Sequence, residues 1–186
     1  MDGIDGMLGS GTLLILLSSS ILMILIGTHS VNIFSFLILI PVLLGFLCFN
    51  FSKSKLFLGD SGSLFLAYFL SFFVLETLSQ KELSGWVWLI LFSHFLTETT
   101  LTTILRIFLT KDWFKPHKSH AYQNLARVLD SHVKVTLSTV FFHILWLFPL
   151  AYVAVQLPNL GLVLFIISSA PVFIITMLYG PLYSKD

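Results

Sequence analysis

The chain has 186 residues, of which 56% are hydrophobic and only 10% are charged, and its mean hydropathy is +0.95. Because soluble globular domains usually carry about a quarter charged residues, this composition excludes an ordinary soluble domain and predicts a membrane protein. The net charge of +1 gives no indication of nucleic-acid binding, and the single cysteine, Cys48, excludes an intrachain disulfide and a zinc cluster built on thiolates.

Six stretches approach the roughly 20 apolar residues that a helix needs to cross the hydrocarbon layer of a bilayer. They are residues 11–27, 31–49, 62–78, 86–109, 134–155 and 160–180. We therefore predict an all-α fold, a polytopic bundle of about six transmembrane helices that forms a single integral membrane domain over residues 1–186. Three prolines lie inside the predicted spans, where proline commonly kinks a helix without breaking it; they are Pro41, Pro149 and Pro171.

The basic residues predict the orientation of these spans, since cytoplasmic loops are enriched in Lys and Arg. Only Lys81 falls on one side of the predicted bundle. The other nine basic residues fall on the opposite side: Lys53, Lys55, Arg106, Lys111, Lys115, Lys118, Arg127, Lys134 and Lys185. This asymmetry places both termini, the 50–61 connection and the 110–133 loop in the cytoplasm.

The first polar segment of that face runs from Met1 to Gly6. Asp2 and Asp5 stand three residues apart, so in a helix or turn both carboxylates face the same way, and Gly3 and Gly6 permit tight turns and close approach by a ligand. The alternative is a solvated amino terminus whose acids cap the first helix. The pattern does not fit a calcium loop, because the alternating oxygen ligands and the distant glutamate are absent.

The second polar segment surrounds Asp60, a lone carboxylate at the point where a loop becomes a strongly hydrophobic helix. The beginning of a helix offers unpaired N–H groups and the positive end of its dipole, which suits a phosphate. Magnesium often takes one or two carboxylates together with substrate phosphates. The alternative is a common N-cap aspartate.

The third polar segment lies in the basic 110–133 loop, where His117 and His120 stand three residues apart with Lys118 and Ser119 between them. Imidazoles in this position could bind phosphate oxygens or transfer a proton. A zinc site is poorly supported, since neither an HExxH pattern nor cysteines accompany them. The alternative is a basic loop attracted to anionic headgroups.

The fourth span carries polar residues at steps of four, which place them on one helical face: His94, Glu98, Thr102 and Arg106. Ionisable groups within spans are costly and face a protein interior or a cavity. We expect Glu98 to pair with His94 or with a group of another helix, and we favour packing or support of the site over direct catalysis. His143, in the fifth span, is predicted to be a hydrogen-bonded interior residue.

Together these segments resemble the polyprenyl-phosphate N-acetylhexosamine-1-phosphate transferases, the superfamily of the MraY translocase and the WecA-type initiating enzymes. Residues 2–6 resemble the family's D-G-[IL]-D-G segment. Residues 50–63 resemble its N-x5-[IL]-F-x-G-D-x-G-S box, with Lys53 or Ser54 where a proline is often found. Residues 117–123 resemble the H-x-S-H-x-Y-Q loop of the subgroup that begins bacterial surface polysaccharides.

The resemblance implies transfer of a sugar-1-phosphate from a UDP-N-acetylhexosamine to polyprenyl (undecaprenyl) phosphate with release of UMP, at the cytoplasmic face of the bacterial inner membrane. It implies Mg²⁺, with Mn²⁺ as an alternative, held by Asp60. The implied catalytic residues are Asp60, Asp2 and Asp5. The implied substrate-binding residues are Gly3, Ile4, Asn50, Lys55, His117, Ser119, His120, Tyr122 and Gln123. The sugar is left open, as is a homodimer.

The chain departs from the family in extent. Members are expected to have about ten or eleven spans and an adjacent aspartate pair upstream of the first segment, and this chain has neither, which indicates the carboxy-terminal half of the family fold. The resemblance therefore predicts that the reading frame extends upstream of Met1, or that the gene is split or truncated. Two other classes remain as alternatives: a membrane transporter, favoured by the His94 and Glu98 face, and a noncatalytic fragment of such a transferase.

Overall fold

The computed structural model describes residues 3–28, 31–51, 54–109, 114 and 118–183. Throughout these ranges the regular structure is helical and contains no strand, which confirms the predicted all-α class. The helices are α1 (Met7–Leu25), α2 (Val31–Asn50), α3 (Gly59–Ser79), α4 (Gly85–Leu109), α5 (Ala121–Val128), α6 (His132–Phe142), the π-helical turn η1 (His143–Leu147), α7 (Phe148–Gln156), the 3-10 turn η2 (Pro158–Leu160) and α8 (Gly161–Tyr179).

Six of these helical runs in the described residues are long and apolar enough to cross a membrane, as predicted. They are α1 to α4, the continuous run His132–Gln156 and the run Pro158–Tyr179. The helix α5 is shorter, with 8 residues, and was not predicted. Apolar side chains cover the outer surface of the spans, Val31, Phe34 and Ile38 among them, as expected of helices that lipid solvates on their outer faces.

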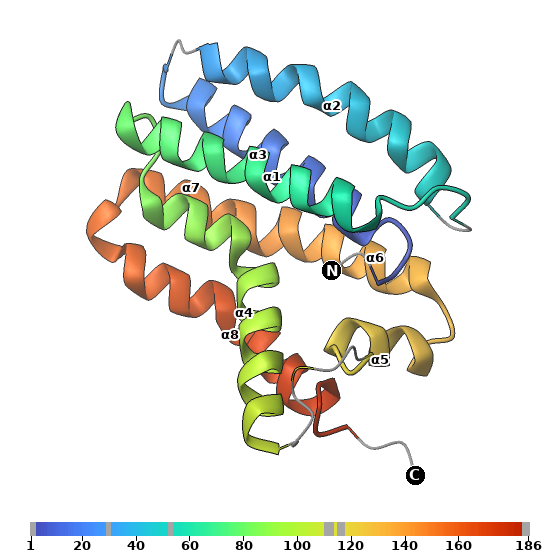
Figure 1. Ribbon diagram of the computed structural model, residues 1–186. Helices are drawn as coiled ribbons and strands as arrows, with labels where there is room; N and C mark the ends of the chain where they lie inside the picture. The colour runs from blue at the N-terminus through green and yellow to red at the C-terminus, as the bar shows by residue number, and fades with distance from the viewer. Residues whose placement is uncertain (1–2, 29–30, 52–53, 110–113, 115–117, 184–186) are drawn as a thin grey trace.

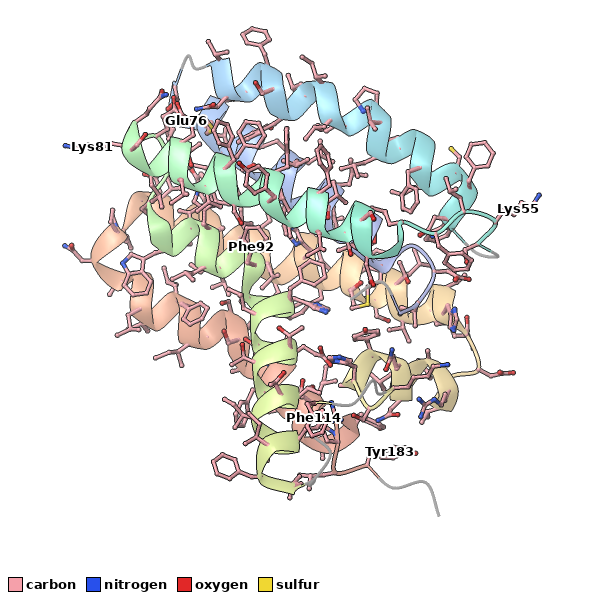
Figure 2. All side chains as sticks on the ribbon, in the orientation of Figure 1. Lys55, Glu76, Lys81, Phe92, Phe114 and Tyr183 are labelled. Atoms are coloured by element: carbon pink, nitrogen blue, oxygen red, sulfur yellow. The ribbon has the colours of Figure 1, made fainter. Side chains whose placement is uncertain are left out.

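The spans α1, α2, α3 and α6–α7 run alongside one another in Figure 1. The core lies between them and the first part of α4, where Leu16, Leu22 and Ile90 are fully buried. Lys55 and Lys81 project from opposite ends of this bundle in Figure 2. The beginning of α1 and the short helix α5 lie toward the Lys55 end, so the first and third polar segments share one end of the molecule, as the orientation argument predicts.

The helix α4 bends part-way along its 25 residues. In Figure 1 its first part runs beside α3 and α7, and its second part turns across their direction toward α5 and the last turns of α8. The helix contains no proline, but the Thr99 hydroxyl donates to the Phe95 carbonyl (2.7 Å) and the Thr103 hydroxyl to the Thr99 carbonyl (2.8 Å). Such bonds compete with the helix ladder and favour bending. The span predicted over residues 86–109 is therefore present as a bent helix.

The fifth span is interrupted by the π-helical turn η1. Pro149 follows it, and a proline ring clashes with the carbonyl four residues earlier, here Leu145 within the turn. The wider turn relieves that clash, so the span continues without breaking. His143 begins this turn and lies with its Nε2 3.0 Å from the Ser18 hydroxyl of α1, which confirms it as a hydrogen-bonded interior residue.

Candidate functional site

The turn that precedes α1 is fastened to the end of α2. Gly6 adopts a left-handed conformation with φ 75°, which a residue with a side chain rarely adopts, and its N–H donates to Oδ1 of Asn50 (2.8 Å). The Asn50 amide in turn donates to the Leu56 carbonyl (2.7 Å). With an exposed fraction of only 3%, Asn50 braces the first two polar segments against each other; its predicted contact with substrate stays a prediction.

Asp5 is oriented by groups from two other elements. The Ser54 hydroxyl donates to its Oδ1 (2.7 Å), and its Oδ2 lies 3.4 Å from Nδ1 of His132. Its backbone carbonyl accepts a hydrogen bond from the Thr136 hydroxyl (2.7 Å). Sequence reasoning missed His132, although it directly follows Ser131, a typical N-cap residue that caps α6 by accepting from the Lys134 N–H (3.3 Å).

The first polar segment packs directly on α5. A Cβ atom on Gly3 would lie 2.5 Å from Nε2 of Gln123 and 3.0 Å from the Tyr122 hydroxyl, so any other residue there would displace these side chains of α5. Ile4 is buried in a small core with Tyr122, and Met7, Ala126 and Val135 complete it. The predicted meeting of the first and third segments is therefore present in the fold.

These contacts enclose a cavity of about 670 Å³. Its walls come from the first segment and from the region of α5 and the start of α6; the lining residues with chemical function are Gly3, Ile4, Asp5, Lys118, Gln123, Arg127, Asp130, Ser131 and His132. Small-molecule sites typically have volumes of about 300–1,000 Å³. The cavity thus has the size and the mixed charge of a site for a polar ligand.

Gln123 gives this cavity an unused acceptor. Its Oε1 is buried and has no hydrogen-bond partner among the described residues, while the residue lines the cavity. Buried polar atoms in folded proteins are nearly always paired with protein groups or water, so this oxygen is available to a ligand that donates a hydrogen bond.

The histidine loop is held from inside the bundle by α4. Nδ1 of His120 lies 3.0 and 3.1 Å from the two carboxylate oxygens of Glu98, and the Ala121 N–H donates to Glu98 Oε1 (2.9 Å). The His120 ring also stacks on Tyr122, with centroids 5.3 Å apart. Glu98 thus pairs with the N-cap residue and the first residue of α5, which matches the expected pairing with a group of another helix. Ser119 is half-buried, whereas His117 lies outside the described residues.

The second polar segment occupies a different position. Asp60 is exposed in the first turn of α3, and Leu58, not Asp60, is the N-cap residue of that helix. Neither Asp60 nor Lys55 lines the cavity, and Lys55 points away from the bundle (Figure 2). The structure therefore brings the first and third segments together and connects the second through Asn50 and Ser54, with the Asp60 carboxylate outside the cavity.

Asp60 instead lies near an apolar groove of about 500 Å³ among α1, α3 and α4. Ser63, three residues further along α3, lines this groove, as do Leu66, Leu70 and Phe95. The Ser63 hydroxyl donates to the Asp60 carbonyl (3.1 Å). Asp60 thus belongs to the helical turn of α3 that lies at one end of the groove.

The oxygen donors near Asp60 suit a hard cation whose ligands include both protein carboxylates and phosphate oxygens. The described residues hold no group of three or more His, Cys, Asp or Glu side chains that could bind a metal ion, and Asp2 lies outside them. Magnesium, however, usually keeps several waters and takes only one or two carboxylates plus phosphate oxygens. An exposed carboxylate at the start of a helix, such as Asp60, meets that requirement.

A sequence model of the family described as glycosyl transferase family 4 matches residues 1–78. A probable undecaprenyl-phosphate N-acetylglucosaminyl 1-phosphate transferase of Bacillus subtilis (strain 168) is 34% identical over 169 residues, 90% of this chain. The chain belongs to glycosyl transferase family 4. Phospho-N-acetylmuramoyl-pentapeptide-transferases of Leuconostoc citreum and Clostridium botulinum (strain Eklund 17B) are 40% and 43% identical over 65 residues, 35% of this chain.

These family relatives are considerably longer than the chain. The matched stretch covers 46% of the Bacillus protein and 20% of each of the two pentapeptide-transferases. No solved structure matches the chain. The six apolar helices, together with the similarity to these relatives, indicate that this member of the family is a multi-pass membrane protein.

Proposed function

We propose that this chain forms part of an enzyme that transfers N-acetylhexosamine-1-phosphate from a UDP-sugar to undecaprenyl phosphate and releases UMP. The names of its relatives describe phospho-sugar transfer of this kind. The proposal places the site on the cytoplasmic face of the inner membrane, where Lys118, Arg127 and Lys134 lie. Its product would begin a cell-surface glycan.

The observation that carries the proposal is the cavity between the first polar segment and α5. Gly3, Ile4 and Asp5 form one wall, and Lys118 and Arg127 bring positive charge to the other. A UDP-sugar combines a base and a sugar, which offer hydrogen-bond donors, with a diphosphate that needs its charge neutralised. The cavity supplies groups for each of these parts.

The roles of individual residues follow from this arrangement. Gln123 offers its unpaired Oε1 to a donor on the base or the sugar. Lys118 and Arg127 bind the diphosphate. Asp5, held by Ser54 and His132, hydrogen-bonds a hydroxyl or N–H group of the nucleotide and stays oriented because its own partners fix it.

The lipid acceptor fits the groove that begins beside Asp60. A polyprenyl chain is apolar and branched, and the groove is lined almost entirely by apolar side chains of α1, α3 and α4. An isoprenoid lying there places its phosphate at the water-facing end, where Asp60 is exposed. Asp60 would hold Mg²⁺, and that ion when bound neutralises phosphate charge. The donor and the acceptor thus occupy separate sites at one end of the bundle.

A transporter is the rival interpretation, and the observation behind it is the set of ionisable groups inside the bundle. Two of them are engaged in the described structure: Glu98 bonds to His120 and Ala121, and His143 lies beside Ser18. Both contacts fix the packing of helices or loops, and the larger cavity opens among polar residues at one end of the molecule. This favours the transferase.

The test is a transfer assay with the purified chain. Radiolabelled UDP-N-acetylglucosamine, undecaprenyl phosphate and Mg²⁺ are incubated with the protein, and labelled lipid is extracted and counted; UDP-N-acetylgalactosamine and 6-deoxy relatives are then compared. We expect labelled lipid from the unsubstituted chain and a loss of at least about 100-fold in Asp60→Asn, because that change removes the charged ligand proposed for the Mg²⁺ that neutralises the phosphates.

The matched control is Glu76→Gln, which removes a carboxylate at the Lys81 end of α3 and should leave the rate unchanged. Absence of labelled lipid from a folded chain that still binds UMP would show the noncatalytic alternative. Uptake of a labelled solute into vesicles without any lipid product would show the transporter.

A further inference from the structure

Glu98 is a buried carboxylate that none of the roles above uses. It lies in the middle of α4 with an exposed fraction of 2%, and it does not line the cavity of about 670 Å³. Burying a carboxylate is costly unless hydrogen bonds compensate it. Three donors converge on it: Nδ1 of His120 (3.0 Å from Oε2), the Ala121 N–H (2.9 Å) and the Thr102 hydroxyl (3.3 Å).

The bond from Ala121 meets a requirement of α5. The first N–H groups of a helix have no partner within the helix, and an N-cap side chain usually accepts one of them. His120 is the N-cap residue of α5, but its side chain makes no capping bond. Glu98 accepts from the first N–H of α5 in its place, and its negative charge lies at the favourable end of the helix dipole.

The helix α5 depends on such anchors because it has only 8 residues, and isolated helices shorter than about 12 residues are marginal in water. Its middle is anchored by Asn124, whose amide donates to the Tyr179 carbonyl (2.7 Å). Between the two anchors, Gln123 lines the cavity and Tyr122 packs on Ile4. The placement of α5 therefore decides the shape of the cavity wall.

Glu98 also fixes the ring of His120. An ionised carboxylate only accepts hydrogen bonds, so the approach of both its oxygens to Nδ1 makes that nitrogen the donor. The ring is held against Tyr122 at the same time, with an interplanar angle of 21°. The orientation of this histidine is thus set from inside the bundle.

We propose that Glu98 is a positioning residue, which caps α5 from α4, orients His120 and so holds the α5 wall of the nucleotide cavity in place. The chemical consequence rests on the proposed function, because it concerns how a UDP-sugar is held. The capping itself is a property of the fold and can be tested without any reaction.

The first experiment measures hydrogen exchange of the α5 amides in the full chain in detergent. We expect Glu98→Ala to speed exchange in the first turn of α5 by about 5-fold or more, the effect of losing a cap. Glu98→Gln keeps an oxygen for the Ala121 N–H and should stay close to the unsubstituted chain, as should Glu76→Gln. Unchanged exchange in Glu98→Ala, with α1 and α8 still protected, would overturn the proposal.

The second experiment separates positioning from general stability. UMP binding and transfer rates are compared in Glu98→Ala, His120→Ala and the double variant. Because misplacing groups around a reaction by about 1 Å can cost 100-fold in rate, we expect Glu98→Ala to lower kcat strongly and Glu98→Gln to restore most of it. The two alanine substitutions should be markedly less than additive, since one acts partly through the other.

Additive effects of the two substitutions, or a Glu98→Gln variant as impaired as Glu98→Ala, would contradict the proposal. The proposed function fails in a different way: the unsubstituted chain then forms no labelled lipid. In that case faster α5 exchange and weaker UMP binding in Glu98→Ala still support the role of Glu98, and their absence still overturns it.

Discussion

At the scale of single residues, the site depends on two glycines for different reasons. At Gly3 the limit is space, since a Cβ there would displace the Gln123 amide and press on the Tyr122 ring of α5. Gly6 is required by backbone conformation as well, because its φ of 75° lies in the left-handed region and the Phe51 ring lies 2.8 Å from where a Cβ would be. The turn over residues 3–6 thus fixes the start of α1 and one wall of the cavity.

This predicts that Gly6→Ala destabilises the protein. An alanine in the left-handed region costs about 1–2 kcal/mol, and contact with Phe51 adds to that cost, so thermal unfolding in detergent should begin several degrees lower. Gly45→Ala is the matched control, since a Cβ there meets nothing within 4 Å and the position lies within α2. Equal melting temperatures for the two variants would contradict the prediction.

At the scale of elements, the fifth span is connected to α1 through a polar pair inside the bundle. His143 and Ser18 are both buried and lie 3.0 Å apart. The π-helical turn positions this contact, because a wider turn changes the direction in which the His143 side chain leaves the helix. The pair therefore fixes how α1 and the fifth span face each other.

We predict that Ser18→Ala lowers stability by about 1 kcal/mol, since it leaves a buried imidazole nitrogen without this partner. Ser20→Ala provides the comparison, because the Ser20 hydroxyl donates only to the Leu16 carbonyl of its own helix (2.7 Å). Alanine is also the better helix former, so that variant should unfold at or above the temperature of the unsubstituted protein. Reversal of this order in calorimetry would disprove the assignment.

At the scale of the whole molecule, charge and helix packing agree on one orientation. Lys55 and Lys81 flank α3 and lie at opposite ends of the bundle (Figure 2). Most other basic residues of the described ranges belong to the Lys55 end, where the cavity also lies. If the bundle follows the usual charge asymmetry, that end faces the cytoplasm.

Cysteine labelling tests this directly in a Cys48→Ser background. A membrane-impermeant maleimide should modify Lys55→Cys only in inverted vesicles and Lys81→Cys only in intact cells stripped of their outer layers. Modification of both from the same side would show that α3 does not cross the membrane, and the reverse pattern would place the cavity outside. Labelling after solubilisation in detergent controls for reactivity.

Much of this structure could be predicted from the local properties of the sequence. The six spans follow from length and hydropathy, because every helix that crosses the bilayer needs about 20 mostly apolar residues, wherever it lies in the chain. The glycines around Asp5 and the position of Asp60 in a first helical turn were also predictable from the residues themselves. The predicted role of Asp60 in binding metal stays a prediction, as do the substrate contacts of Lys55, His117 and Ser119.

The parts that were missed depend on partners far apart in the chain. Glu98 and His120 are separated by 22 residues, and Asp5 and His132 by 127, so no spacing pattern links them. The helix α5 was missed because its 8 residues are too short and too polar for a hydropathy argument. The bend of α4 was missed because its cause, two threonine hydroxyls, also occurs in straight helices.

The bend of α4 makes the two ends of the bundle different in shape (Figure 1). The second part of α4 turns across the bundle on the side of α5 (Figure 1), so the molecule extends sideways at that end. Exposed Ile104, Ile107 and Phe108 keep this arm among acyl chains. The bend therefore sets the width of the apolar surface that the molecule presents to lipid near the cavity.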